Sequence, residues 1–202
     1  ITFHEPTHKY YVNGSCKGNI SCTGFVHEFF HHFDPKETIT KMRRGPKWSS
    51  SKYFGMTDEQ IIKEWIDNGK QASSAGTAMH LAIEQFLHGA PEEIDPAVKD
   101  TPEWRYFMAF WRDCGDDLEP YRSEWEVFTD SLVPVARERK IKLCGSIDMV
   151  FYRPSDNSYV IYDWKRSKEI KTENTFGETG YGPLAHIPNL NYWAYTIQLN
   201  VY

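Results

Sequence analysis

The spacing of apolar residues changes near residue 115, and this change limits the fold more than any other feature of the sequence. Between the opening residues and this point, apolar residues recur at intervals of three and four, as in amphipathic helices. After it, they alternate with polar residues or form short apolar runs, as in strands. A last helical pattern covers 189–202. We expect these elements to form an α/β fold, in which a mixed central β-sheet is flanked by helices.

Capping residues and glycines set the limits of the expected helices. Asp34 and Pro35 begin a helix that Gly45 ends, and Thr57 with Gln60 forms a capping box. These signals predict helices over 35–44, from Thr57 to about Gly69, over about 72–88, and from Thr101-Pro102 to Gly115.

Turn residues separate the expected strands. Residues 1–12 form one strand that leads into a tight turn at Asn13-Gly14. A long loop covers 167–188, and loops of this length usually carry function or are mobile. The other strands cover 122–128, 141–151 and 159–163, with a turn at 154–158 between the last two.

Length and composition suit one globular domain over 1–202, with a helical part at about 20–115 and a sheet and last helix at about 120–202. Hydrophobic residues make up 40% of the chain, but no apolar run approaches the roughly 18–20 residues of a membrane span. Four cysteines without metal-site spacing, and no secretory signal, predict an intracellular protein that is not secreted.

The net charge of −5 argues against a protein that coats nucleic acid, because phosphate binding usually needs a surplus of Lys and Arg. It does not argue against an enzyme that cuts nucleic acid, because a hydrolytic metal site is built from carboxylates. Basic segments can still hold the phosphate backbone: Lys36 to Lys47, Arg137 to Lys142, and Lys165 to Lys171, which includes Arg166 and Lys168.

The last two strands bring together the residues with the clearest chemistry. Asp148 lies on one strand and Asp163 ends the next, so a hairpin places the two carboxylates side by side. Because side chains alternate along a strand, Asp163 and Lys165 project to one face and Trp164 to the other. Carboxylates hold a hard divalent cation, and a lysine beside them positions water or stabilises developing negative charge.

Two helices carry further polar residues at a spacing of four, which places each pair on one helix face. His80 and Glu84 lie on the helix over 72–88, and an imidazole aimed at the aspartates would complete a metal shell. Gln198 and Tyr202 lie on the last helix, where they would either grip phosphate or pack the helix.

The order of these motifs resembles the RecB-type branch of the PD-(D/E)XK nuclease superfamily. The order is Gly-x-x-x-His at 76–80, Gly-x-x-Asp at 145–148, Asp-x-Lys at 163–165 and Gln-x-x-x-Tyr at 198–202. The resemblance implies a restriction-endonuclease-like core over about 76–202. The first 70 residues resemble nuclease modules of large DNA viruses more than bacterial repair subunits.

The resemblance implies a role for each matching residue. The lysine is catalytic with the two aspartates, and Glu84 and Glu124 are supporting acids. The implied metal ligands are His80, Asp148, Asp163 and the backbone carbonyl of Trp164, and the implied DNA contacts are Ser167, Gln198 and Tyr202, to which the basic segment adds Arg166 and Lys168.

We therefore expect a DNA hydrolase that uses one or two Mg²⁺ or Mn²⁺ ions and acts at ends or on single strands. Its partners would be DNA and a larger replication or repair polypeptide or complex. Some relatives hold an iron–sulfur cluster through cysteines beyond the last motif, and because the chain ends at Tyr202 we expect no such cluster within it. The alternatives are an RNA endonuclease of the cap-snatching type, which lacks the Gln-x-x-x-Tyr pair, and an inert nucleic-acid-binding module, which would lack an acid or the lysine.

Overall fold

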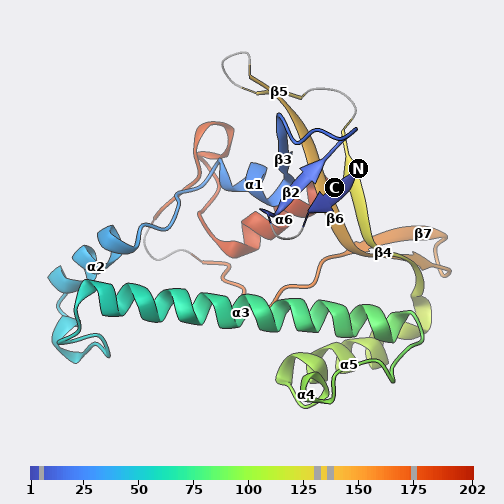
Figure 1. Ribbon diagram of the computed structural model, residues 1–202, viewed down its shortest axis with the longest axis horizontal. Coiled ribbons are helices and arrows are strands. Elements are labelled where there is room, and N and C mark those ends of the chain that lie inside the picture. The colour runs from blue at the N-terminus through green and yellow to red at the C-terminus, as the bar shows by residue number, and fades with distance from the viewer. Residues whose placement is uncertain (5–6, 130–132, 136–138, 174–176) are drawn as a thin grey trace.

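The computed structural model describes residues 1–4, 7–129, 133–135, 139–173 and 177–202 (Figure 1). Its main sheet has five strands and is mixed, which confirms the expected α/β class. The long strand β6 (Arg139–Arg153) is central and pairs antiparallel with β4 (Glu119–Phe128), β5 (Val133–Val135) and β7 (Ser158–Tyr162). The short strand β3 (Asn19–Ser21) pairs parallel with β6.

The N-terminal segment differs from the single strand that the sequence predicts. Two short strands, β1 (Thr2–His4) and β2 (Lys9–Tyr11), pair antiparallel with each other. The predicted turn is present, because Asn13 and Gly14 both have positive φ and a bridge joins Val12 to Ser15. The expectation of one strand was wrong because its alternating residues belong to two strands that pair with each other.

The described residues form helices α1 to α6 and several short 3₁₀ turns. Helices α2, α3 and α5 begin at the capping residues that the sequence predicts, since Asp34, Thr57 and Thr101 each accept a hydrogen bond from the first turn. The helix bounds are α1 Cys22–His27, α2 Pro35–Arg44, α3 Asp58–Leu87, α4 Pro96–Lys99, α5 Pro102–Cys114 and α6 Asn191–Val201; the 3₁₀ turns are Trp48–Ser50, Gly115–Asp117 and Gly182–Leu184.

The predicted break at Gly69 was wrong, because α3 runs through it for 30 residues. Residues 66–75 are all exposed, so this stretch has no apolar face from which a helix could be predicted. A glycine within a helix costs only about 1 kcal/mol relative to alanine. The packed ends of α3 on either side hold the exposed stretch in helical form.

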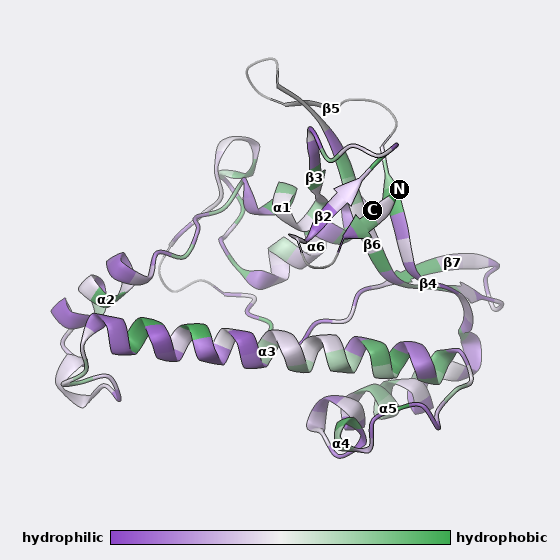
Figure 2. Cartoon of the chain, viewed as in Figure 1, coloured by the Kyte–Doolittle hydropathy of each residue, from purple (hydrophilic) through white to green (hydrophobic). Residues whose placement is uncertain are grey.

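Helix α3 extends beneath the sheet, with α4 and α5 on the side away from it (Figure 1). Its C-terminal half is the more apolar one (Figure 2), and there Met79 and Ile83 join a buried cluster with Trp104 and Phe107 of α5. No helix in the described part of the chain has both the length and the apolar character that crossing a bilayer requires.

Helix α6 packs closely against the centre of the sheet. Gly145 of β6 permits this, because a Cβ atom built there would lie 2.5 Å from the Tyr202 ring and 3.0 Å from Sγ of Cys22. The close contact brings the C-terminal helix to the strand that carries Asp148. The close spacing between α6 and the sheet therefore depends on a residue with no side chain.

Candidate active site

The hairpin of β6 and β7 places Asp148 beside Asp163. Met149 pairs with Tyr162, so Asp148 and Asp163 are the next residues opposite each other at the end of β7. The backbone N–H of Trp164 donates a hydrogen bond to Oδ2 of Asp148 over 2.6 Å. The turn at 154–158 thus fixes the register in which β6 and β7 pair, and this register places the two carboxylates next to each other.

Strand β4 brings a third carboxylate from the other side of β6. Pairing of Ser123 with Met149 and of Trp125 with Ile147 sets Glu124 opposite Asp148. Glu124 has a φ of 42°, a left-handed conformation that a non-glycine residue rarely adopts. Its Oε2 accepts a hydrogen bond of 2.9 Å from Oγ of Ser146, which holds the carboxylate over the sheet.

Helix α3 supplies the histidine. Nδ1 of His80 lies 3.6 Å from Oδ2 of Asp148, and Nε2 lies 2.9 Å from the carbonyl oxygen of Trp164. One turn further on, Glu84 accepts a hydrogen bond from Ser123 of β4 over 2.9 Å. A cavity of about 470 Å³ opens over His80, Glu84 and Glu124, so this cluster is accessible from solvent.

The lysine is paired with the second aspartate. Nζ of Lys165 lies 2.5 Å from Oδ2 of Asp163, and the Asp163 side chain is only 5% exposed. On the opposite face, Trp164 packs among Phe107 and Phe110 of α5. This alternation is the one predicted for 163–165, and the catalytic roles of the residues stay a prediction.

The last helix supports Asp163. Gln198 is buried, and its Nε2 donates to Oδ1 of Asp163 and to the Tyr202 hydroxyl, each over 3.0 Å. Burial raises the pKa of Tyr202 above its ordinary value, so the hydroxyl keeps its proton. The sequence did not single out Tyr195, whose ring lies 5.6 Å from Nζ of Lys165; its position three residues before Gln198 on the same helix face was the available signal.

The electrostatics of the cluster disfavour negative charge in the absence of a cation. Burial, reinforced by the neighbouring Asp163 carboxylate, raises the pKa of Asp148 to about 6. His80, the N–H of Trp164 and Lys165 oppose this rise but do not cancel it. A carboxylate held under this repulsion gains most from a positive ion nearby.

The donor set fits a divalent cation. His80, Glu124 and Asp148 each offer one ligand atom, and these atoms lie within 4.8 Å of one another. Two carboxylate oxygens and an imidazole nitrogen, with the Trp164 carbonyl 2.9 Å from the imidazole, are a donor set that can hold a divalent metal ion. Among the described residues, this group contains Glu124, expected as a supporting acid, and not Asp163, whose oxygens face Lys165 and Gln198.

The residues predicted to contact DNA are dispersed around the site. Arg166 forms an ion pair of 2.8 Å with Glu103 of α5, Ser167 accepts a hydrogen bond from Asn191 of α6, and Lys168 is exposed. Gln198 lies beneath Asp163, with Tyr202 beside it. Of the predicted basic segments, the one over Arg137 to Lys142 falls partly outside the described residues.

An α/β sheet with acids, a lysine and a histidine at one end is typical of metal-dependent phosphodiester hydrolases. Comparison with protein families identifies the superfamily. Residues 49–202 match the model of the PD-(D/E)XK nuclease superfamily, and the chain belongs to that superfamily. Its members are nucleases that use divalent metal ions and act on nucleic acid. Searches of curated proteins and of solved structures found no match.

Proposed function

We propose that this protein is a deoxyribonuclease that hydrolyses DNA phosphodiester bonds with Mg²⁺ or Mn²⁺, acting at ends or on single strands. The observation that carries the proposal is the convergence of His80, Glu124 and Asp148 beside the pair formed by Asp163 and Lys165. Elements far apart in the sequence supply these groups. Their meeting beside a cavity that His80 and Glu124 line is the kind of arrangement that metal-assisted phosphate hydrolysis requires.

The cluster of His80, Glu124 and Asp148 would hold the cation, with the Trp164 carbonyl in support. A bound divalent cation supplies Lewis acidity, which draws charge from a phosphoryl oxygen and makes water easier to deprotonate. His80 is oriented for this task by its contacts with Asp148 and the Trp164 carbonyl. Glu124 is oriented by Ser146.

Lys165 and Asp163 would act on the reacting phosphate. The Lys165 ammonium is partly exposed, so it can donate to a phosphoryl oxygen or to the attacking water while Asp163 holds it in place. Gln198 acts as a positioning residue, because it fixes the other oxygen of Asp163. We therefore place Gln198 in support of the site, and its contact with DNA stays a prediction.

The decisive experiment is digestion of end-labelled single-stranded and double-stranded DNA with Mg²⁺, Mn²⁺ or EDTA. We expect metal-dependent cleavage, with a product ladder that reveals polarity and the preference for ends. The variant Asp163→Ala should lose cleavage while it keeps most DNA binding. Asp113→Ala is the matched control, because Asp113 is an exposed acid at the end of α5. Full activity of Asp163→Ala would refute the proposal.

Matched RNA strands in the same assay separate the alternatives. The histidine in the metal cluster is shared with cap-snatching RNA endonucleases, so preferential RNA cleavage would replace the DNA assignment. Metal titration by calorimetry tests the alternative of an inert nucleic-acid-binding module. An inert module would bind no divalent ion, whereas a nuclease would bind one. We also propose that the protein is a RecB-type nuclease of the kind found in large DNA viruses. We propose further that it acts within a larger replication or repair polypeptide or complex.

A further inference from the structure

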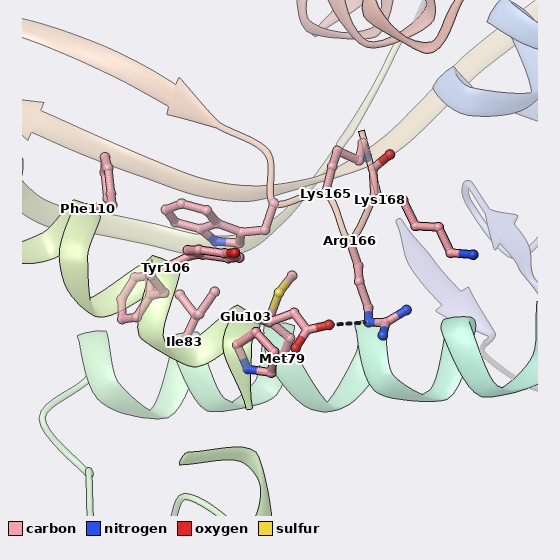
Figure 3. Close-up of a pocket in the computed structure, with 12 residues that line it drawn as sticks. Met79, Ile83, Glu103, Tyr106, Phe110, Lys165, Arg166 and Lys168 are labelled. Carbon is pink, nitrogen blue, oxygen red and sulfur yellow. Dashed lines mark ion pairs between the residues drawn. The ribbon is translucent and has the colours of Figure 1, made fainter. Parts of the chain in front are cut away.

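A second cavity, of about 440 Å³, lies on the α5 side of the segment 164–168 (Figure 3). Helix α3 contributes Met79 and Ile83 to it, and α5 contributes Tyr106 and Phe110. Trp164 completes the wall, next to Phe110. Most of the lining is therefore apolar or aromatic.

Cationic side chains surround this aromatic cavity. Figure 3 shows Arg166 reaching from the segment after Lys165 to Glu103, with which it forms an ion pair of 2.8 Å. Lys168 is exposed at the rim, and Lys165 also lines the cavity. Lys165 is paired with Asp163 and Arg166 with Glu103, so Lys168 gives the rim its excess positive charge, in a chain whose net charge is −5.

Tyr106 is the unusual member of the lining. Its side chain is 75% exposed, although apolar burial is available in the cavity beside it. An exposed aromatic ring next to an aromatic wall and a cationic rim has the composition of a stacking platform for single-stranded nucleic acid. The rings accept the flat face of a base, and the cations accept the phosphates on either side.

We infer that this cavity binds one unpaired nucleobase of the DNA strand, stacked against Tyr106 and the neighbouring aromatic residues. The inference rests on the proposed function, and it adds a site for the substrate strand outside the catalytic cluster. Arg166 and Lys168 would hold the flanking phosphates. The carboxylate of Glu103 holds Arg166 in the orientation this requires.

The position of the cavity relates the bound base to the cleaved bond. Lys165 lines the cavity and also pairs with Asp163 at the active site. From Lys165 to Lys168 the chain spans at most about 10 Å. Successive nucleotides rise about 3.4 Å along one strand, so the stacked base lies within about three nucleotides of the phosphate that Lys165 faces.

A stacking site of this kind favours unpaired DNA. A base within a duplex must be extruded before it can enter the cavity, which costs free energy, whereas a single strand or a frayed end presents its bases directly. The cavity therefore supplies a physical reason for a preference for single strands and ends. It would contribute little to binding of an intact duplex.

Photo-cross-linking tests the site without any requirement for cleavage. Single-stranded oligonucleotides with 5-iodouracil at successive positions are irradiated with the protein in EDTA, and the attached peptides are identified by mass spectrometry. We expect cross-links to Tyr106 or Trp164 from one or two adjacent positions. Cross-links confined to other surfaces would show that the base binds elsewhere and would overturn the inference.

Affinity measurements provide a second test of the proposed base site. Tyr106→Ala should weaken binding of single-stranded DNA roughly 5- to 100-fold, while Tyr106→Phe keeps the ring and nearly full affinity. Tyr159→Ala is the matched control, because Tyr159 is an exposed tyrosine on β7 outside the cavity. Equal affinities of Tyr106→Ala and Tyr159→Ala would contradict the inference.

The two proposals fail in different ways. Cross-linking at Tyr106 without metal-dependent cleavage would remove the nuclease function and leave the base site. Cleavage without cross-linking in the cavity would remove the base site and leave the nuclease function.

Discussion

Nε2 of Gln198 lies 3.0 Å from Oδ1 of Asp163, and this hydrogen bond joins the last helix to the end of the hairpin of β6 and β7. The other oxygen of Asp163 faces Lys165. The carboxylate is therefore held at both oxygens by residues from two different elements. Its orientation depends on α6 as much as on the strand that carries it.

Replacing Gln198 with Ala should lower metal-dependent cleavage by roughly 10- to 100-fold, the usual cost of losing a residue that orients a catalytic group. A positioning role predicts a fall in kcat with little change in KM for DNA, whereas a DNA contact predicts a rise in KM. Steady-state kinetics on a labelled oligonucleotide distinguishes the two. Asn200→Ala is the control, because Asn200 is exposed on the same helix and bonds only to Thr196 among the described residues.

Replacing Lys165 with Met should reduce kcat by at least about 100-fold, the usual effect of removing a donor that stabilises transition-state charge. Binding of the metal should persist, because the lysine repels a cation and its removal frees Oδ2 of Asp163. Calorimetric titration with Mn²⁺ and single-turnover cleavage measure the two effects separately. A variant that loses metal binding together with activity would contradict this assignment.

Asp148→Asn should stabilise the metal-free protein at neutral pH. The pKa of Asp148 is raised to about 6, against about 3.9 in an unfolded chain, so its ionisation costs stability as the pH rises from about 4 to above 6. We expect the variant to gain about 1–3 kcal/mol in unfolding free energy at pH 7.5, and almost nothing at pH 4. Urea unfolding of both proteins in EDTA at the two pH values measures the difference, and an equal gain at both would point to another cause.

Gly145→Ala should destabilise the protein by about 1–3 kcal/mol, because the added methyl group has no space between β6, the Tyr202 ring and Cys22. Displacement of α6 should also lower activity, since Gln198 moves with it. Thermal unfolding and the cleavage assay test both effects. Gly69→Ala is the control, and it should be neutral or slightly stabilising because nothing lies within 4 Å of that position.

The sequence by itself determined the local geometry of the site. Alternation along a strand puts Asp163 and Lys165 on one side and Trp164 on the other, and the turn at 154–158 sets Asp148 beside Asp163. Capping residues fixed where the main helices begin. These features follow from spacing because they depend on neighbours within a few residues or across one hairpin.

Only the tertiary structure decided which groups share the candidate metal site. It brings Glu124 opposite Asp148, keeps α3 continuous through Gly69, and directs Gln198 to Asp163. It also places α5 next to the segment after Lys165, and the aromatic cavity lies between them. These relationships depend on how helices pack against the sheet. Such packing is set by the sum of many weak contacts between distant segments, which no local pattern of residues encodes.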